Sequence, residues 1–265
     1  MHDFDAYLER IGLAAAPPPG WQAIHRAHVT SIPFENLDPH RGIPVSLEQR
    51  DLERKLVSER RGGYCFEHNL LFASALEQLG LAVEPMLART RTSGAPPEAR
   101  PATHLLLRVS DEEGVAWHAD VGFGFGTLLD PIPFGADPDA VHEQSGWSFR
   151  VVEEGSELVL QTLGAAGWSD VYGFAPRAVS RIDIELSNWW TCTNPRSPFV
   201  FGLVAAVNHE DGRREVICDW SGRLEATAMA PGAVETSEEP RSVIPARLEQ
   251  FGLPGFELDG DGRVR

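Results

Sequence analysis

The sequence predicts an α+β protein, on three observations. Hydrophobic residues recur at helical spacing through the first third of the chain, and at alternating spacing after Gly80. The 265 residues also include 25 glycines and 20 prolines, a content that indicates many turns and short strands. A chain of this length can bury a substantial core without disulfide bonds. Its three cysteines, an odd number, argue against a disulfide framework.

Four helices are predicted in the first third of the chain, over residues 5–12, 21–30, 46–60 and 65–79. Pro17–Pro19 stops the first of them. Ser46 and Gln49 have the spacing of a capping box, which predicts that the third helix begins there. The fourth helix ends at Gly80, a residue type suited to the position after a helix terminus.

Short strands are predicted in the remainder of the chain, over residues 104–109, 115–121, 148–152, 157–161, 170–174, 182–186 and 199–207. The first two form a hairpin, and the spacing of the set is typical of a barrel or sandwich. A further hairpin is expected around Asp211 and Gly212, and a terminal helix near residues 243–251.

The charge of the chain limits its partners. A net charge of −16 and an isoelectric point near 4.9 argue against nucleic acid or an anionic membrane as a partner. No apolar run approaches the roughly 18 residues that cross a bilayer. The acidic start, Met1–Asp5, lacks the pattern of a signal peptide. Together with the few cysteines, these features predict a cytoplasmic protein.

The segment from Arg61 to Glu67 contains the first candidate for chemistry. Gly62 and Gly63 end one helix and allow a sharp turn, so that Cys65 lies in the first turn of the next. A thiol there meets the positive end of the helix dipole and unpaired N–H groups, which favour the thiolate. The thiolate is the nucleophilic form. A lone cysteine at a helix start can equally be a small buried hydrophobic residue.

A histidine and an aspartate on the first hairpin are candidate partners for this cysteine. Pairing Val109 with Val115 places His104 directly opposite Asp120, with Cβ atoms about 5 Å apart. A carboxylate beside an imidazole fixes its tautomer and raises its basicity. With Cys65, the pair would form a Cys-His-Asp triad. A register slip of one residue would separate the two, and a surface histidine in an ordinary strand is the alternative.

Other signals are weaker. Cys65 and His68 have a spacing found in zinc sites, but no second pair of ligands follows, so we expect no metal. The glycines over residues 122–126 follow a strand, yet the sequence after them cannot open a dinucleotide-binding helix. His25 and His28 lie one helical turn apart and are expected to be solvated or to cap a helix.

The stretch Arg61–Asn69 resembles the active-site motif of the arylamine N-acetyltransferases. Four further stretches match that family in the same order, over residues 31–37, 103–105, 120–124 and 187–190. The resemblance implies three parts. These are a helical domain with Cys65 over residues 1–84, a β-barrel with His104 and Asp120 over residues 85–188, and an α/β lid over residues 189–265.

The resemblance also implies a reaction. It implies acetyl-CoA as the acetyl donor, an arylamine or hydrazine as acceptor, an acetyl-cysteine intermediate, and the three residues above as the catalytic triad. Phe34 and Phe123 match aromatic positions that line the family's acceptor pocket. The backbone of the following turn is expected to approach the CoA pyrophosphate, through Gly124, Phe125, Gly126 and Thr127.

Three other functions remain open from the sequence. An amide synthase of the same superfamily would use the same triad with a carrier-protein thioester as donor. A papain-like peptidase or transglutaminase would also suit a helix-borne cysteine and a strand-borne histidine. A binding module that has kept the fold is the non-enzymatic alternative, which an intact triad disfavours. The sequence is compatible with a monomer or a homodimer.

Overall fold

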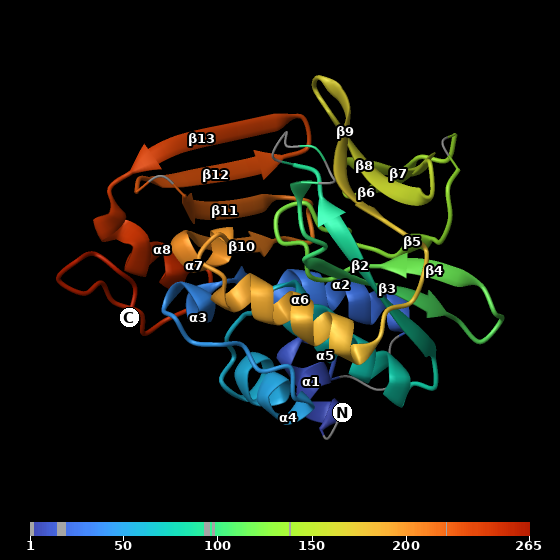
Figure 1. The fold of residues 1–265 in the computed structure, drawn as a ribbon, viewed down its shortest axis with the longest axis horizontal. Coiled ribbons are helices and arrows are strands. Elements are labelled where there is room, and N and C mark those ends of the chain that lie inside the picture. The colour runs from blue at the N-terminus through green and yellow to red at the C-terminus, as the bar shows by residue number, and fades with distance from the viewer. Residues whose placement is uncertain (1–2, 15–19, 93–95, 97–98, 138, 221) are drawn as a thin grey trace.

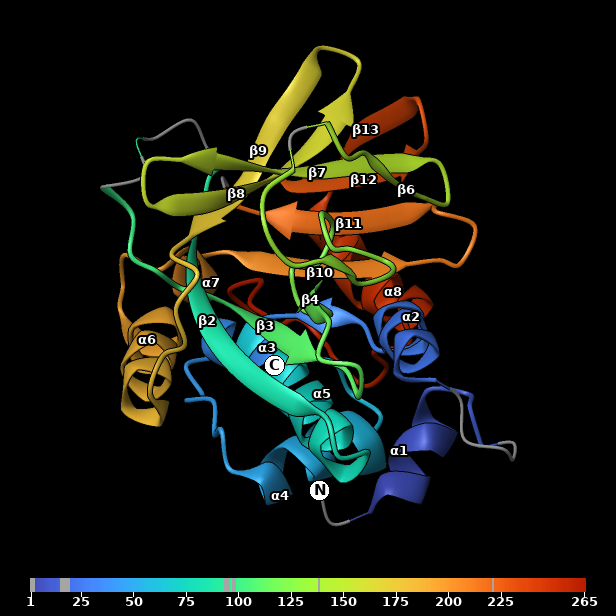
Figure 2. The same ribbon diagram turned by 90° about the vertical axis from the view of Figure 1, so that its right-hand side faces the viewer.

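The computed structural model describes residues 3–14, 20–92, 96, 99–137, 139–220 and 222–265. It confirms a mixed fold of helices and antiparallel sheets (Figure 1). The helices of the first third gather on one side of two sheets, as both ribbon views show (Figures 1 and 2). Pro17–Pro19 lie outside the described residues. Within the described ranges, no helix has both the length and the apolar character needed to cross a membrane.

The helical part contains α1 (Phe4–Arg10), α2 (Trp21–Ser31), α3 (Leu37–His40), α4 (Gln49–Leu52), its π-helical continuation η1 (Glu53–Ser58), and α5 (Cys65–Gln78). The capping box predicted at Ser46 is wrong, because the Ser46 hydroxyl donates to Asp51 Oδ2 at 2.7 Å and α4 begins three residues later. The predicted end of the fourth helix is confirmed, since Gly80 has φ +82° directly after the Leu79 cap.

One face of α5 holds the helical part against the larger sheet. Its buried side chains Leu71, Phe72 and Leu76 pack in one cluster with residues of α1, α2 and η1, and with Leu107 and Val109 of the sheet. Each such side chain contributes about 1.5–3 kcal/mol when fully buried. This packing fixes the start of α5, and therefore Cys65, against the first strands of the sheet.

The larger sheet has eight antiparallel strands in the order β5-β4-β3-β2-β9-β8-β7-β6. Their bounds are β2 (Ala82–Thr90), β3 (His104–Ser110), β4 (Ala116–Ala119), β5 (Ile132–Pro133), β6 (His142–Gln144), β7 (Trp147–Glu154), β8 (Glu157–Gly164) and β9 (Gly167–Phe174). The two edges approach one another, since Gln144 on β6 donates to the carbonyl of Asp130, just before β5, at 2.7 Å. The sheet is thus a nearly closed barrel, which Figure 2 shows curling above α5.

The register of the first hairpin differs from the predicted one. Val109 pairs with Trp117 and not with Val115, a shift of two residues. The Asp111 carboxylate is the local reason, because it accepts the backbone N–H of Val115 at 2.8 Å and holds this residue in the turn. A shift by two keeps every side chain on its predicted face, since side chains alternate with a period of two.

The second sheet joins the two ends of the chain. It contains β1 (Phe34–Glu35), β10 (Leu203–Asn208), β11 (Arg214–Asp219), β12 (Leu224–Ala230) and β13 (Ala233–Glu239), in that spatial order. The short helix η3 (Arg241–Val243) and α8 (Ile244–Gln250) follow it. The predicted hairpin around Asp211 and the terminal helix are confirmed. Because β1 pairs with β10, Phe34 lies beside the C-terminal part of the chain.

The strand predicted over residues 182–186 is wrong, because these residues belong to α6 (Arg181–Thr193). Ser180 and Asp183 start this helix, with the Ser180 hydroxyl donating to the Asp183 carboxylate at 2.6 Å. The alternating apolar residues suggested a strand, yet Ile184 is buried while Ile182 is 67% exposed. Residue 188, where a domain boundary was expected, lies inside α6.

The strand predicted over residues 199–207 is half wrong. Its first residues form α7 (Pro198–Phe201), and β10 begins only at Leu203. The Ser197 hydroxyl caps α7 by accepting the backbone N–H of Phe199 at 3.3 Å, and Pro198 suits the first position of a helix. The Phe199 ring of this short helix meets the rings of Phe34 and Tyr64 edge to face, with centroids 6.0 and 5.7 Å apart.

Candidate active site

Cys65 is the first residue of α5 and is buried. Its Sγ lies 3.5 Å from the carbonyl oxygen of Thr103, the residue before β3. The two glycines before it permit a close approach of chain segments, since a Cβ on Gly62 would lie 2.1 Å from the carbonyl oxygen of Pro33. No side chain fits there without moving backbone. The turn therefore places Cys65 close to the segment before β1 and to the segment before β3.

The structure brings His104 and Asp120 together. His104 begins β3, Asp120 directly follows β4, and the two side chains are joined by His104 Nε2 and Asp120 Oδ2 at 2.7 Å. The sequence had suggested that the two residues lie directly opposite one another in the ladder, but in the structure they do not. They meet because the register shift of two residues left both on the same face.

The electrostatics of the pair favour opposite charges. Burial disfavours a charged ring, but the Asp120 carboxylate and the neighbouring Cys65 thiol raise the pKa of His104 to about 10. Burial also disfavours the carboxylate, yet the charge of His104 and the hydrogen bonds to Asp120 hold the pKa of that carboxyl well below its usual range. Near neutral pH the pair is therefore an imidazolium and a carboxylate.

Asp120 accepts three hydrogen bonds besides that of His104. Its Oδ1 accepts from Asn69 Nδ2 at 3.0 Å and from the backbone N–H of Gly122 at 2.9 Å. Its Oδ2 accepts from the Tyr172 hydroxyl of β9 at 2.9 Å. Sequence reasoning gave no role to Asn69 or Tyr172. Asn69 is the last residue of the Arg61–Asn69 motif, whereas the sequence around Tyr172 gives no sign of a contact with Asp120.

The expectation that His25 and His28 are solvated or capping is wrong, because both are fully buried. His25 Nδ1 donates to the carbonyl of Leu129 at 3.0 Å, so its Nε2 carries no proton and accepts the backbone N–H of Asp120 at 3.2 Å. Burial lowers the pKa of His25 to about 4, which keeps the ring neutral. His25 thus supports the backbone of Asp120 from α2.

A cavity of about 420 Å³ opens beside Cys65 and His104, between the two sheets and α6–α7. Cys65 and His104 lie on its wall, together with Phe34 and Phe123. The His104 and Phe123 rings meet edge to face, with centroids 4.9 Å apart. Further aromatic side chains line it, namely Phe125, Trp190, Phe199, Phe201 and Trp220, and the remaining lining residues are Thr90, Thr92, Thr103, Thr191, Ser197, Pro198 and Val204.

The turn after Phe123 is held in place by the C-terminal sheet. Of the residues expected to approach CoA, Phe125 lines the cavity, whereas Thr127 is buried and its hydroxyl donates to the Asp120 carbonyl at 2.8 Å. Arg214 of β11 donates to the carbonyls of Phe125 and Thr127 at 2.8 and 3.1 Å. Gly124 has φ +81°, and a Cβ there would lie 3.1 Å from the Phe34 ring. The contact of this turn with CoA stays a prediction.

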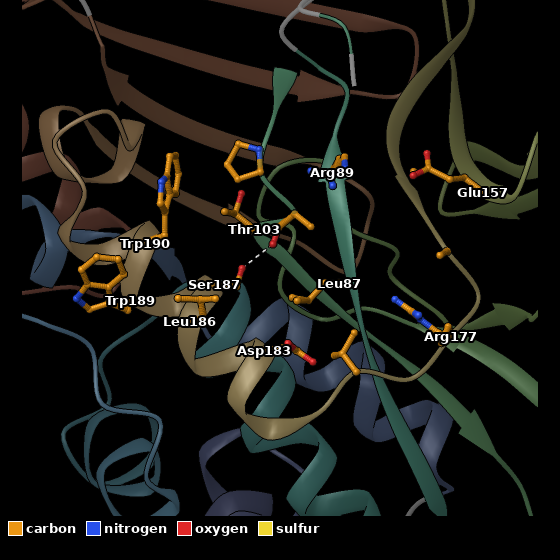
Figure 3. Close-up of a pocket in the computed structure, with 15 residues that line it drawn as sticks. Leu87, Arg89, Thr103, Glu157, Arg177, Asp183, Leu186, Ser187, Trp189 and Trp190 are labelled. Carbon is orange, nitrogen blue, oxygen red and sulfur yellow. Dashed lines mark hydrogen bonds between the residues drawn. The ribbon is translucent and has the colours of Figure 1, made fainter. Parts of the chain in front are cut away.

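Two further cavities adjoin the first. Figure 3 shows one of about 570 Å³ between β2 and α6, which shares Thr103 and Trp190 with the cavity beside the triad. The Ser187 hydroxyl donates to the carbonyl of Ala102 at 2.5 Å across it, tying α6 to the segment before β3. The other, of about 430 Å³, is lined by Arg100 and Arg196 and also shares Thr103 and Trp190. In the part of the chain that the structure describes, no group of His, Cys, Asp and Glu could hold a metal ion.

The chain is similar to known proteins over most of its length. The model of a family described as N-acetyltransferase matches residues 20–235. The arylamine N-acetyltransferase of Mycolicibacterium smegmatis is 38% identical, over 97% of this chain and 94% of its own length. The chain belongs to the arylamine N-acetyltransferase family of acyltransferases.

Other arylamine N-acetyltransferases match over similar lengths. That of Escherichia coli K12 is 36% identical, over 98% of this chain and 92% of its own length. The structure of the Mycobacterium marinum arylamine N-acetyltransferase in complex with CoA superposes with a TM-score of 0.86 and 33% identity. It covers 95% of this chain and 93% of the M. marinum chain. The similarity therefore includes both sheets and the helices between them.

Proposed function

We propose that this protein transfers an acetyl group from acetyl-CoA to the nitrogen of an arylamine or arylhydrazine, through an acetyl-cysteine on Cys65. One observation carries the proposal. The Cys65 thiol, the His104 ring and the Asp120 carboxylate form one buried array, with Nε2 and Oδ2 2.7 Å apart, on the wall of an aromatic cavity. Membership of the family and the CoA complex of the M. marinum relative support the donor.

In the first half-reaction, the Cys65 thiolate attacks the carbonyl carbon of the acetyl thioester. A new C–S bond to Cys65 forms, the C–S bond to CoA breaks, and the departing CoA sulfur takes a proton from the His104 imidazolium. The carboxylate of Asp120 holds the ring in position and stabilises its charge before the transfer. The products are acetyl-Cys65, free CoA and a neutral His104.

In the second half-reaction, the amine nitrogen attacks the carbonyl carbon of acetyl-Cys65. The C–N bond forms, the C–S bond to Cys65 breaks, and His104 takes the proton that the amine loses. The Cys65 thiolate and the His104 imidazolium are restored, so the protein ends each turnover in its starting protonation state. Because the two substrates react in turn with the same sulfur, the route is ping-pong. The aromatic rings of Phe34 and Phe123 would hold the acceptor ring beside the sulfur.

Binding of CoA itself needs donors for its phosphates. We propose that backbone N–H groups of the turn Gly124–Thr127 approach the pyrophosphate, because Arg214 holds this turn rigid at the cavity. The net charge of −16 makes such local donors necessary for a polyanion. We also propose that the chain divides into a helical domain, a barrel and a lid. Its location is proposed to be the cytoplasm.

The test is incubation with acetyl-CoA alone, followed by intact mass measurement. We expect one acetyl adduct on the wild-type protein, release of one equivalent of CoA, and loss of the adduct when an arylamine is added. Cys65→Ala should show neither adduct nor release while remaining folded. A protein that alkylates at Cys65 but never releases CoA would instead support an amide synthase supplied by a carrier protein.

A further inference from the structure

Apart from Cys65 and His104, the described residues that line the cavity beside Cys65 are uncharged. Among the described residues that line it there is no Asp, Glu, Lys or Arg. Its ionisable groups are Cys65 and His104, and in the acetyl-enzyme that meets the acceptor the first is acetylated and the second is neutral, so neither offers a positive charge. A substrate that carries a net charge would therefore find no counter-charge within this cavity.

Five residues of the described lining carry a hydroxyl group, and two of them, Thr191 and Ser197, use it on the backbone; Thr90, Thr92 and Thr103 are the others and offer neutral donors only. Thr191 Oγ1 donates to the carbonyl of Ser187 at 2.8 Å, and Ser197 Oγ donates to the carbonyl of Thr191 at 2.5 Å. Both protons are therefore directed at the backbone around α6 and not into the cavity. A carboxylate that leaves water without compensating donors loses several kcal/mol of hydration.

Aromatic surface continues to the mouth of the cavity. Phe201 is 56% exposed and Trp220 is 41% exposed, and their rings meet edge to face with centroids 6.3 Å apart. Phe125 contributes a third partly exposed ring. A substituent on the far side of an acceptor ring therefore meets aromatic surface as well, and not a basic group.

Basic side chains lie outside this cavity. Arg100 and Arg196 line the adjoining cavity, which shares Thr90, Thr103 and Trp190 with the first. This arrangement separates charge from aromatic surface within one continuous entrance. Basic side chains thus lie where a phosphate-bearing donor would approach, whereas the described residues around the site of the acceptor ring include none.

From these observations we propose that the cavity selects uncharged acceptors and rejects arylamines that carry a carboxylate on the ring. This inference rests on the proposed function, since it names the class of acceptor for the same site. It follows from the lack of a cationic side chain in the described lining and from the aromatic mouth.

The test compares methyl 4-aminobenzoate with 4-aminobenzoate at saturating acetyl-CoA. The two differ in charge, and the ester withdraws more electron density, so its amine is the weaker nucleophile. A preference for the ester must therefore come from binding. We expect kcat/KM, measured by CoA release, to favour the ester by about 100-fold. Equal values, a preference for the carboxylate, or no reaction of the ester with the acetyl-enzyme would each overturn the inference.

A variant at the mouth tests the electrostatic cause. Phe201→Arg places a guanidinium at an exposed position beside Trp220, and Phe201→Leu removes the same ring without adding charge. We expect the ratio of carboxylate to ester kcat/KM to be about 10-fold higher in Phe201→Arg than in Phe201→Leu. Equal ratios in the two variants would contradict the inference.

The intact mass of the protein separates the two levels of proposal. If acetyl-CoA leaves no adduct on Cys65, the proposed function fails and the inference on acceptors fails with it. If the adduct forms and both acceptors remove it at the same rate, the proposed function stands and only the inference fails.

Discussion

The Tyr172 hydroxyl donates to Oδ2 of Asp120 at 2.9 Å, to the same oxygen that accepts His104 Nε2. A strand of the barrel, β9, thus supports the residue after β4, with the Tyr172 ring 4.8 Å from the His104 ring between centroids. Because the Tyr172 proton is used in this bond, its oxygen accepts from His118 Nε2, 2.7 Å away. The carboxylate is held by a chain of buried groups, and its orientation depends on each.

We expect Tyr172→Phe to lower kcat/KM for acetyl transfer by about 10-fold or more while the protein stays folded, because a hydrogen bond to a charged carboxylate contributes about 1.5–3 kcal/mol. Tyr7→Phe is a matched control, since Tyr7 is equally buried but bonds to His28 in the helical part, at 2.8 Å. Both variants should lose some stability towards urea. An equal loss of rate in both would show that Tyr172 acts through stability and not through Asp120.

Asp120→Asn should cost much more, on the order of 10³-fold or more in rate. The asparagine side chain would place an NH₂ group among four hydrogen-bond donors that now point at the Asp120 carboxylate. The substitution also removes the negative charge that keeps His104 protonated. The pKa of His104, about 10 in the native protein, should fall towards that of a buried neutral ring. Cys65 should then react more slowly with iodoacetamide near pH 7. An unchanged alkylation rate would contradict the ion pair.

The same pair predicts how stability depends on pH. The folded-state pKa of His104, about 10, lies above the unfolded value of about 6.5. Folding therefore takes up a proton in this window, so the contribution of His104 is complete below about pH 6.5 and is lost as pH rises towards 10. Urea unfolding between pH 6.5 and 10 measures it. The fall in stability should be smaller in His104→Gln, and parallel curves for the two proteins would count against the raised pKa.

The sequence predicted those parts of the site that depend on local chemistry. The Gly62-Gly63 turn and the start of α5 at Cys65 follow from neighbouring residues. The side-chain contact of His104 with Asp120 occurs although the register was wrong, because a shift of two residues leaves the faces unchanged.

Features that depend on distant parts of the chain could not be predicted in this way. The strand β1 joins its sheet by pairing with β10, more than 160 residues later. Tyr172 meets Asp120 only once the barrel curls. Residues 182–186 alternate in hydrophobicity although Ile182 faces solvent. The alternating pattern alone therefore predicted a strand where the structure has the helix α6. The boundaries of the three proposed domains stay predictions.

Acylation should be confined to Cys65. Burial raises the pKa of the Cys192 thiol, and burial together with Glu225 raises the pKa of Cys218 to about 11, so both remain thiols at neutral pH. Peptide mapping after exposure to acetyl-CoA should therefore find the acetyl group on Cys65. Cys192→Ser and Cys218→Ser are the controls and should keep the adduct. An acetyl group on either residue, or one that persists in Cys65→Ala, would refute the assignment.

The turn before Cys65 should tolerate no side chain at Gly62. A Cβ there would lie 2.1 Å from the carbonyl oxygen of Pro33, so β1 or the start of α5 must move. We expect Gly62→Ala to lower the free energy of unfolding by about 1–3 kcal/mol, the cost of overpacking a rigid site. The displacement of Cys65 should also reduce the acetyl adduct formed at short times. Gly164→Ala is the matched control, because its nearest neighbour is 4.0 Å away and it lies on the barrel strand β8. Urea unfolding should separate the two variants, and similar stabilities would show that the turn yields easily to a side chain.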